Sequence, residues 1–307
     1  MLLAAGRGQR MAPLSLVVGK PALDVLGRPL LSAALSCLEA ACRPLVVNLH
    51  HRPRQVMAAV RQSLAPESPV SFSWEGELLG GAGGVSHATR YFSPGAVITG
   101  NADVWTDVSL EPLLRSGCAD TVVLALLPHP DPGKWSSVVL NRDGNVTSIL
   151  PRGVGGGGER YLFTGFQMLG ERVVAALPPP PAEMSSVWEP LRREGRLRGV
   201  VVEGSWREAG TPEAYRELVV EELGASSFVH PGAEVGRDVT VERSAIGVGC
   251  VVGEGCAIVD SVVLHGARVG PGTSLVGSIV AGPVELAAHT RAERELVLPL
   301  GRFASNG

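Results

Sequence analysis

The last quarter of the chain repeats every 17 residues, and this repeat limits the fold more than any other feature. Aliphatic residues recur at intervals of 6, 6 and 5 residues, at positions 229, 235, 241, 246, 252, 258, 263, 269, 275 and 280. Hexapeptide repeats are typical of a parallel β-helix, in which each hexad forms one flat face and three faces complete a coil. We therefore expect residues 228–290 to form a β-helix of about three coils, followed by a C-terminal tail, residues 291–307.

The interior of this predicted β-helix should hold more than the aliphatic positions. Small or β-branched residues follow most of them at a spacing of four, and Cys250 and Cys256 occupy two of these places. Ser244, Ser261 and Ser278 keep the period of 17 residues. Both cysteines therefore read as core residues, because the packing pattern explains them without any redox chemistry.

The remainder of the chain, residues 1–224, alternates segments with strand and helix patterns. Strand-like runs end at positions 3, 49, 74, 100, 127 and 150, and helical spacing covers residues 29–41, 53–64, 109–116 and 213–223. Such alternation favours an α/β domain with a doubly wound, Rossmann-like mixed sheet in which most strands are parallel. In these sheets ligands bind beyond the carboxyl ends of the strands, where the glycine loop at Gly6 and the carboxylate of Asp103 both fall.

The glycine loop is suited to phosphate. Gly6 and Gly8 let backbone N–H groups approach an anion closely, and Arg10 and Lys20 add cationic donors. A dinucleotide fingerprint is excluded because Met11 stands where a third glycine is needed. A Walker-type loop is excluded because Pro21 follows the Gly-Lys pair.

Composition removes several classes of function. The net charge is −3, whereas a nucleic-acid binder usually carries a basic excess. The longest apolar run, residues 121–127, is too short to span a bilayer, and no basic segment with a cleavage site follows Met1. The five cysteines, at 37, 42, 118, 250 and 256, lack zinc-type spacing. We expect a cytoplasmic protein that binds neither nucleic acid nor membrane.

The opening sequence LAAGRGQRMAPLS, followed by GKPAL, resembles the signature of the sugar-1-phosphate nucleotidyltransferases, also called NDP-sugar pyrophosphorylases. The run Asn48-Leu49-His50-His51 is similar to a segment of bacterial mannose-1-phosphate guanylyltransferases and N-acetylmuramate-1-phosphate uridylyltransferases. Adjacent histidines on a strand point to opposite faces, so we interpret both as structural. The resemblance also implies that the β-helix coils left-handed.

The resemblance implies a magnesium site. The segment NADVWTD resembles the family's NGDxxTD, with Ala102 for glycine, and makes Asp103 a ligand of Mg²⁺. The segment WREAGTPEAY resembles WxDxGTPxxY, with Glu208 in place of the second aspartate ligand. A glutamate is one methylene longer and offers the same hard oxygen ligands.

The resemblance also implies contacts to both substrates. Nucleotide would be bound by the glycine loop and by a second glycine-rich segment, through Ala4, Ala5, Gly6, Gly8, Glu75, Gly80 and Gly81. The sugar phosphate would meet Arg152, where the family has lysine, and Gly165. Arg10, Lys20 and Asp103 would be the catalytic residues.

Three functions remain for comparison. The first is transfer of a nucleotidyl group from a nucleoside triphosphate to a sugar 1-phosphate, best matched by GTP and mannose 1-phosphate, with uridylyl or thymidylyl transfer close behind. The second is a regulatory homologue that binds nucleotide-sugar and scaffolds an active partner, which the change at Glu208 favours. The third, a hexapeptide acyltransferase, leaves residues 1–224 without a role. We expect a homo-oligomer, formed through the β-helix.

Overall fold

The computed structural model describes residues 1–117, 119–155 and 158–304, and the chain divides into two compact units. Unit 1 comprises Met1–Gly6, Leu31–Pro53 and Ser63–Trp206, and unit 2 comprises Arg7–Leu30, Arg54–Gln62 and Arg207–Gly307. Cys118 lies outside the described residues.

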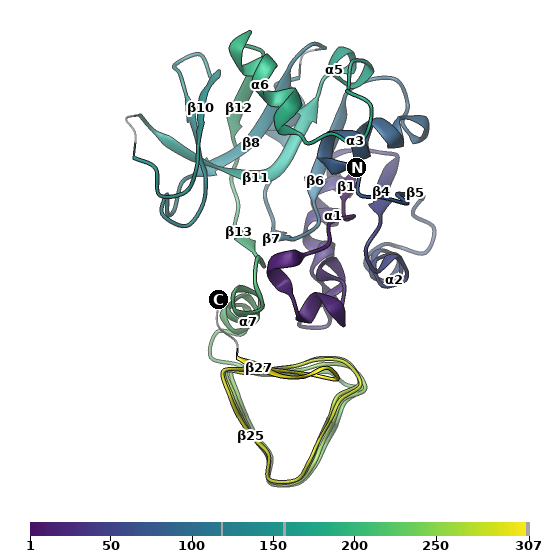
Figure 1. Ribbon diagram of the computed structural model, residues 1–307, viewed down its shortest axis with the longest axis vertical. Helices are drawn as coiled ribbons and strands as arrows, with labels where there is room; N and C mark the ends of the chain where they lie inside the picture. The colour runs from purple at the N-terminus through teal and green to yellow at the C-terminus, as the bar shows by residue number, and fades with distance from the viewer. Residues whose placement is uncertain (118, 156–157, 305–307) are drawn as a thin grey trace. The chain divides into compact units, whose positions relative to one another are not determined.

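Unit 1 is built on a nine-stranded mixed sheet (Figure 1). Its path runs β10-β9-β11-β6-β1-β4-β5, with β8 pairing to both β11 and β12. The strands are β1 Leu2–Leu3, β4 Leu45–Leu49, β5 Val70–Trp74, β6 Val97–Asn101, β8 Val122–Pro128, β9 Ser137–Leu140, β10 Val146–Leu150, β11 Arg160–Leu169 and β12 Leu197–Val201. A short strand, β7 Val104–Thr106, follows β6.

The direction of the strands changes at β11. Strands β6, β1, β4 and β5 are mutually parallel, whereas β11 runs antiparallel to β6, β8 and β9. Every residue of β4 is buried, as expected for a strand covered on both faces. The expected α/β domain with a mixed sheet is therefore confirmed, and the sheet consists of a parallel core and an antiparallel part around β11.

Helices pack on this sheet through apolar side chains. Val85 and Ala88 of α3 share a core cluster with Val46 of β4 and Val97 of β6. Val173 of α5 and Leu191 of α6 join the cluster around β8 and β12. The helices of unit 1 are α1 Leu31–Ala41, α3 Gly80–Ala88, α4 Glu111–Arg115, α5 Glu171–Ala175 and α6 Ser185–Arg193. Within the described residues, none of the helices has the length and hydropathy to cross a membrane.

The C-terminal part of unit 2 is a parallel β-helix, seen end-on as a triangle in Figure 1. Its three ladders are β14-β17-β20-β23-β26, β15-β18-β21-β24 and β16-β19-β22-β25, and β27 Gly301–Ala304 adds an antiparallel strand to β26. The strands that end the ladders are β14 Phe228–Val229, β15 Glu234–Val235, β16 Thr240–Glu242, β24 Glu285–Leu286, β25 Arg291–Glu293 and β26 Glu295–Leu298.

Inside each ladder the register follows the sequence period. Phe228 pairs with Ala245, which pairs with Val262, which pairs with Ile279. The strands between are β17 Ala245–Ile246, β18 Val251–Val252, β19 Ala257–Val259, β20 Val262–Val263, β21 Arg268–Val269, β22 Ser274–Val276 and β23 Ile279–Val280. Equivalent residues of successive coils are therefore 17 positions apart in the sequence. The ladders continue through β25 and β26, so the β-helix extends past residue 290 into the segment expected to be a tail.

From Ile246 onward the aliphatic positions fill the interior, as expected, whereas Val229 and Val235 of the first coil are 42% and 40% exposed. Ile246, Ile258, Val263 and Leu275 are fully buried in one core cluster, and so is Cys250. Burial raises the pKa of the Cys250 thiol, and its Sγ donates to the Leu264 carbonyl. Cys256 is 1% exposed, so the expectation that both cysteines serve the core is confirmed.

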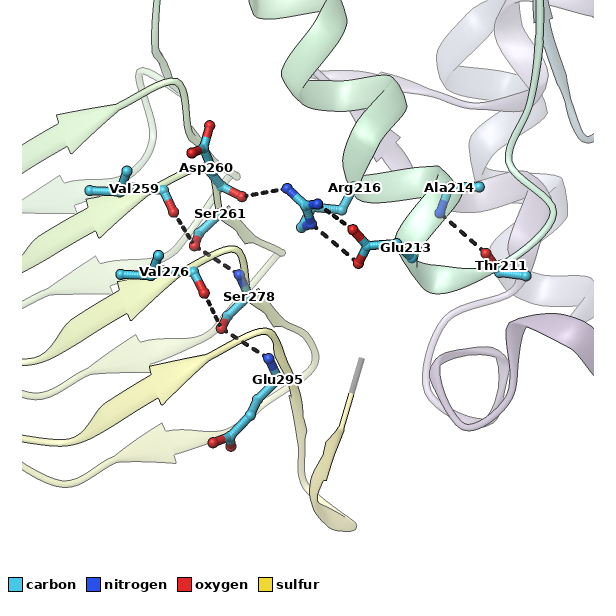
Figure 2. A network of polar contacts seen from close by, with 10 residues as sticks. All are labelled: Thr211, Glu213, Ala214, Arg216, Val259, Asp260, Ser261, Val276, Ser278 and Glu295. Carbon is cyan, nitrogen blue, oxygen red and sulfur yellow. Dashed lines mark hydrogen bonds and ion pairs between the residues drawn. The ribbon is translucent and has the colours of Figure 1, made fainter. Parts of the chain in front are cut away.

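The repeated serines form a hydrogen-bond ladder (Figure 2). Oγ of Ser261 donates to the Val259 carbonyl and accepts from the N–H of Ser278 at 3.0 Å. Oγ of Ser244 accepts from the N–H of Ser261 in the same way, and Oγ of Ser278 accepts from Glu295. The period of the serines therefore satisfies a buried backbone N–H at one corner of each coil.

The rest of unit 2 precedes or closes this β-helix. Helix α7 Pro212–Leu223 begins at Thr211, whose Oγ1 accepts from the N–H of Ala214 (Figure 2). Arg216 pairs with Glu213 and donates to the Asp260 carbonyl at 3.1 Å, which joins α7 to the β-helix. The other elements are the 3-10 helices Gln9–Met11, Leu14–Leu16 and Lys20–Ala22, the hairpin of β2 Asp24–Val25 and β3 Arg28–Pro29, most of α2 Pro53–Ser63, and the end of β13 Trp206–Glu208.

Candidate functional site

The carboxyl ends of the parallel strands in unit 1 lie at one edge of the sheet. Strand β1 pairs with both β4 and β6, and the three run in the same direction. The segment Ala4-Ala5-Gly6 follows β1, and Asp103 follows β6. Strand β5, beside β4, ends immediately before Glu75. This edge therefore brings together the first part of the glycine loop and two of the predicted acidic residues.

A buried hydrogen-bond network ties this edge together. Oδ1 of Asn48 accepts from the N–H of Ala4 at 2.7 Å, and Nδ2 of Asn48 donates to Oε1 of Glu75 at 2.7 Å. Oε2 of Glu75 accepts from the N–H of Leu79 at 3.3 Å. Asn48 is 4% exposed and Glu75 is 2% exposed. A buried carboxylate must be hydrogen-bonded to be tolerated, and here its partners join three separate strand ends.

Glycines make room for this carboxylate and for the loop after it. A Cβ on Gly84 would lie 2.8 Å from Oε1 of Glu75 and 3.0 Å from Nδ2 of Asn48. Gly80 has a φ of +75°, and a Cβ there would lie 2.4 Å from the Ala182 carbonyl. The backbone around Gly80 and Gly81 is therefore fixed by close packing.

Asn48 belongs to this network, and the motifs did not assign it. The sequence placed it in the Asn-x-His-His run without a role, and the run itself was the signal that could have found it. His50 supports the same network, since its Nδ1 lies 3.0 Å from the Glu75 carbonyl.

The segment after β6 is held from two sides within unit 1. Gly165 of β11 has a φ of +92°, and a Cβ there would lie 3.1 Å from Cβ of Asn101. Asp107 accepts from the N–H and Oγ of Ser205, and these two hydrogen bonds lower the pKa of the Asp107 carboxyl. Asp103 is half-buried between these two anchored positions.

Arg152 is placed apart from these residues in the sheet. It follows β10, and strands β9 and β11 separate β10 from β6 in the strand order. Its side chain is exposed. Gly153, next to it, donates its N–H to the Pro132 carbonyl at 2.8 Å.

Four predicted residues, Gly8, Arg10, Lys20 and Glu208, belong to unit 2. Gly8 has a φ of +60°, and a Cβ there would lie 3.4 Å from Cβ of Lys20. Arg10 forms an ion pair with Glu208, at 2.7 Å between Nη2 and Oε1. Unit 2 therefore brings these four together as two pairs.

The loop that carries Lys20 is anchored on both sides. Gln55 of α2 accepts from the N–H of Gly19 at 2.7 Å and donates to the Val17 carbonyl at 3.1 Å. Tyr215 of α7 is fully buried, and its hydroxyl donates to the Asp24 carbonyl. Lys20 itself is only 7% exposed. Gln55 and Tyr215 are therefore positioning residues for this loop, and the motif around the glycines does not contain Gln55.

The carboxylates fit the chemistry of a magnesium ion. Asp103 and Glu208 each carry a carboxylate, the type of oxygen ligand that Mg²⁺ prefers. Among the described residues, no group of three or more His, Cys, Asp or Glu side chains gathers as a ready-made metal site. A divalent ion bound by one or two carboxylates completes its shell with water and substrate phosphates, which suits a nucleotide enzyme.

Residues 1–223 match the family described as nucleotidyl transferase. The chain belongs to the nucleotidyl transferase family. Among curated proteins, this nucleotidyl transferase is 28% identical to the N-acetylmuramate alpha-1-phosphate uridylyltransferase of Caulobacter vibrioides, over 70% of this chain and 92% of that protein. It is 27% identical to the mannose-1-phosphate guanylyltransferase of Mycobacterium tuberculosis, over 70% of this chain and 62% of that protein.

A solved structure shares the fold of this nucleotidyl transferase. HddC from Yersinia pseudotuberculosis superposes with a TM-score of 0.62 at 21% identity, over 72% of this chain and 97% of that one. HddC has also been solved in complex with GMP-PN, with a TM-score of 0.61. The likeness confirms the α/β architecture expected from the sequence.

Proposed function

We propose that this nucleotidyl transferase catalyses attack of a sugar 1-phosphate on the α-phosphate of a nucleoside triphosphate, with pyrophosphate as the leaving group. One sugar-phosphate oxygen forms a bond to the α-phosphorus while the bond to the β-phosphate oxygen breaks. The observation that carries the proposal is the buried network of Asn48 and Glu75, which joins the glycine loop to the backbone around Gly80. This network holds two loops in place, and a nucleotide can contact one of them with its phosphates and the other with its base.

The proposed roles of the residues follow from charge and position. Ala4, Ala5, Gly6 and Gly8 present backbone N–H groups to the nucleotide, and Gly80 and Gly81 read its base. Arg10 and Lys20 neutralise the phosphates, and Arg152 and Gly165 contact the sugar phosphate. Asp103 and Glu208 hold Mg²⁺, which when bound spreads the charge that develops on the phosphates. No covalent intermediate is needed, because positioning and electrostatic stabilisation are sufficient for this type of transfer.

We infer that GTP and mannose 1-phosphate are the substrates. The Asn48-His51 run and the β-helix support this choice, as does the similarity to several proteins named mannose-1-phosphate guanylyltransferase or guanyltransferase. Uridylyl transfer is the second candidate, favoured by the similarity to two N-acetylmuramate alpha-1-phosphate uridylyltransferases. We further propose residues 1–224 as the catalytic domain and a homo-oligomer formed through the β-helix.

A substrate panel tests the proposal. Pyrophosphate release is measured with Mg²⁺ for four nucleoside triphosphates against mannose-, glucose-, N-acetylglucosamine- and N-acetylmuramate 1-phosphate. We expect release with GTP and mannose 1-phosphate. Release with UTP and N-acetylmuramate 1-phosphate instead would establish the second candidate. No release with any pair, together with nucleotide-sugar binding by the same preparation, would show a regulatory protein.

The network itself yields a prediction. The two carboxylate oxygens of Glu75 accept hydrogen bonds from Asn48 and from the N–H of Leu79. Glu75→Gln keeps the shape of the side chain, but one oxygen becomes an NH₂ group that cannot accept, so one of these two hydrogen bonds is lost. Hydrogen bonds to a charged group contribute about 1.5–3 kcal/mol to folding, so Glu75→Gln should be less stable than the wild type. Because the loops that would hold nucleotide lose a common support, we also expect the KM for nucleotide to rise about tenfold with a smaller change in kcat. Glu77→Gln, an exposed glutamate of the same loop, is the control and should leave both constants unchanged. Equal kinetics for the two variants would remove Glu75 from the proposed site.

A further inference from the structure

Arg10 and Glu208 form a hydrogen-bonded ion pair, although we propose that Arg10 binds phosphate and Glu208 binds the metal ion. Nη2 of Arg10 donates to Oε1 of Glu208 at 2.7 Å, across 198 residues of sequence. The Glu208 side chain is 18% exposed and that of Arg10 is 67% exposed. The carboxylate is therefore largely shielded from water while the guanidinium faces solvent, and partial burial reduces the screening of the pair.

The geometry around this ion pair depends on the length of the glutamate and on a glycine. A Cβ on Gly210 would lie 3.2 Å from Nη1 of Arg10 and 3.4 Å from Oε1 of Glu208, so a larger residue there would crowd the pair. An aspartate at position 208 would be one methylene shorter, about 1.5 Å, which takes its oxygens out of hydrogen-bonding range of Nη2 on the same backbone. The pair is thus specific to a glutamate at this position.

The ion pair opposes the proposed task of Arg10. A triphosphate needs the guanidinium as a donor, and the carboxylate of Glu208 already holds one of its nitrogens. The same carboxylate places a negative charge beside the guanidinium that is to receive an anion, and like charges repel. Glu208 therefore competes with the phosphates for Arg10 unless its own charge is neutralised.

We propose that Glu208 acts as a latch on Arg10, which holds the guanidinium away from nucleotide until a divalent cation neutralises the carboxylate. This inference rests on the proposed function. Its consequence is that binding of nucleoside triphosphate depends on a divalent cation for two reasons. One is the ordinary neutralisation of the phosphates, and the other is release of Arg10 from Glu208. Only the second reason depends on the glutamate side chain of this protein.

Measuring nucleotide binding in the absence of metal shows how much the Arg10–Glu208 ion pair alone weakens binding. Isothermal titration calorimetry with GTP, and separately with UTP, is performed on the full chain in EDTA for the wild type, Glu208→Asp and Glu208→Gln. Glu208→Asp keeps the charge and loses the contact, whereas Glu208→Gln loses the charge and keeps the length. Because ion pairs of this exposure contribute up to about 1 kcal/mol, we expect Glu208→Asp to bind about three- to fivefold more tightly than the wild type. Glu208→Gln should tighten binding at least as much.

Two controls connect the effect to the pair. Glu221→Asp shortens a glutamate of α7 that forms a different ion pair, with Arg207 of β13, and should leave nucleotide affinity unchanged. In the background of Arg10→Ala, Glu208→Asp should have no further effect on affinity, because the latch has lost its partner. Thermal unfolding of each variant shows whether the fold is retained.

The outcomes separate the latch from its alternatives. Weaker binding by Glu208→Asp in EDTA would show that Glu208 positions Arg10 for nucleotide, and would overturn the latch. Tighter binding by Glu208→Gln alone would assign the effect to general charge repulsion, and would also overturn it. Failure of the wild type to bind either nucleotide with MgCl₂ present would overturn the proposed function itself. Binding with MgCl₂ but equal affinities in EDTA would overturn the latch alone.

Discussion

Asp103→Asn should lower turnover at least about a thousandfold, because loss of a charged metal ligand removes much of the electrostatic stabilisation on which phosphoryl transfer depends. Asparagine has the same size, and Asp103 is only half-buried, so the fold should be kept. The measurement is Mg²⁺-dependent pyrophosphate release at saturating substrate, with circular dichroism to confirm the fold.

The control for this prediction lies four residues away. Asp107→Asn alters a carboxylate that accepts from the N–H and Oγ of Ser205 and anchors the same segment. It should lower stability slightly and leave turnover within about threefold of the wild type. Unchanged turnover in Asp103→Asn would contradict the proposed mechanism, and equal losses in both variants would show that the segment merely needs to be ordered.

The second large effect concerns stability. Ile258→Ala should destabilise the β-helix by about 2–5 kcal/mol, because Ile258 is fully buried between coils and truncation leaves a cavity. Val276→Ala, on the adjacent strand β22, is the control; its side chain is 39% exposed, and we expect a change within about 0.5 kcal/mol.

Urea unfolding followed by circular dichroism measures both variants. The five tryptophans, at positions 74, 105, 135, 188 and 206, all lie in unit 1, so their fluorescence reports that unit directly. The transition seen by circular dichroism should move to lower urea in Ile258→Ala and stay in place in Val276→Ala. Equal shifts in the two variants would mean that the interior positions of the repeat do not carry its stability.

The parts of the fold with a strict sequence period were predictable. Ile246, Val263 and Leu275 are interior because an aliphatic residue every five or six positions leaves one face of each strand buried. Strands β1, β4, β5, β6, β8 and β10 and helices α1, α2, α4 and α7 were also predicted, since continuous apolar runs and helical spacing are local properties. Strands β9, β11 and β12 and helices α3, α5 and α6 were not predicted from these patterns. The antiparallel placement of β11 was not predicted either, because strand pairing is decided by contacts far apart in the chain.

The sequence predicted which residue types the candidate site contains, but it predicted only part of how these residues contact one another. A motif is enough to identify residues whose role depends on their type, such as the glycines, Arg10, Lys20 and Asp103. The link from Ala4 through Asn48 to Glu75 joins three strand ends, and the bond between Arg10 and Glu208 spans 198 residues. No local pattern encodes such contacts.

The sequence by itself therefore determined the 17-residue repeat of the β-helix, the order of about half of the other strands and helices, and the residue types available for phosphate and metal. Only the tertiary structure decided that the Arg7–Leu30 segment shares a compact unit with α7 and the β-helix, through contacts such as that of Tyr215 with Asp24. It also decided that Glu75 is buried and that Glu208 is bonded to Arg10. Periodicity records which face of an element is buried, whereas a hydrogen bond between distant segments exists only once the chain has folded.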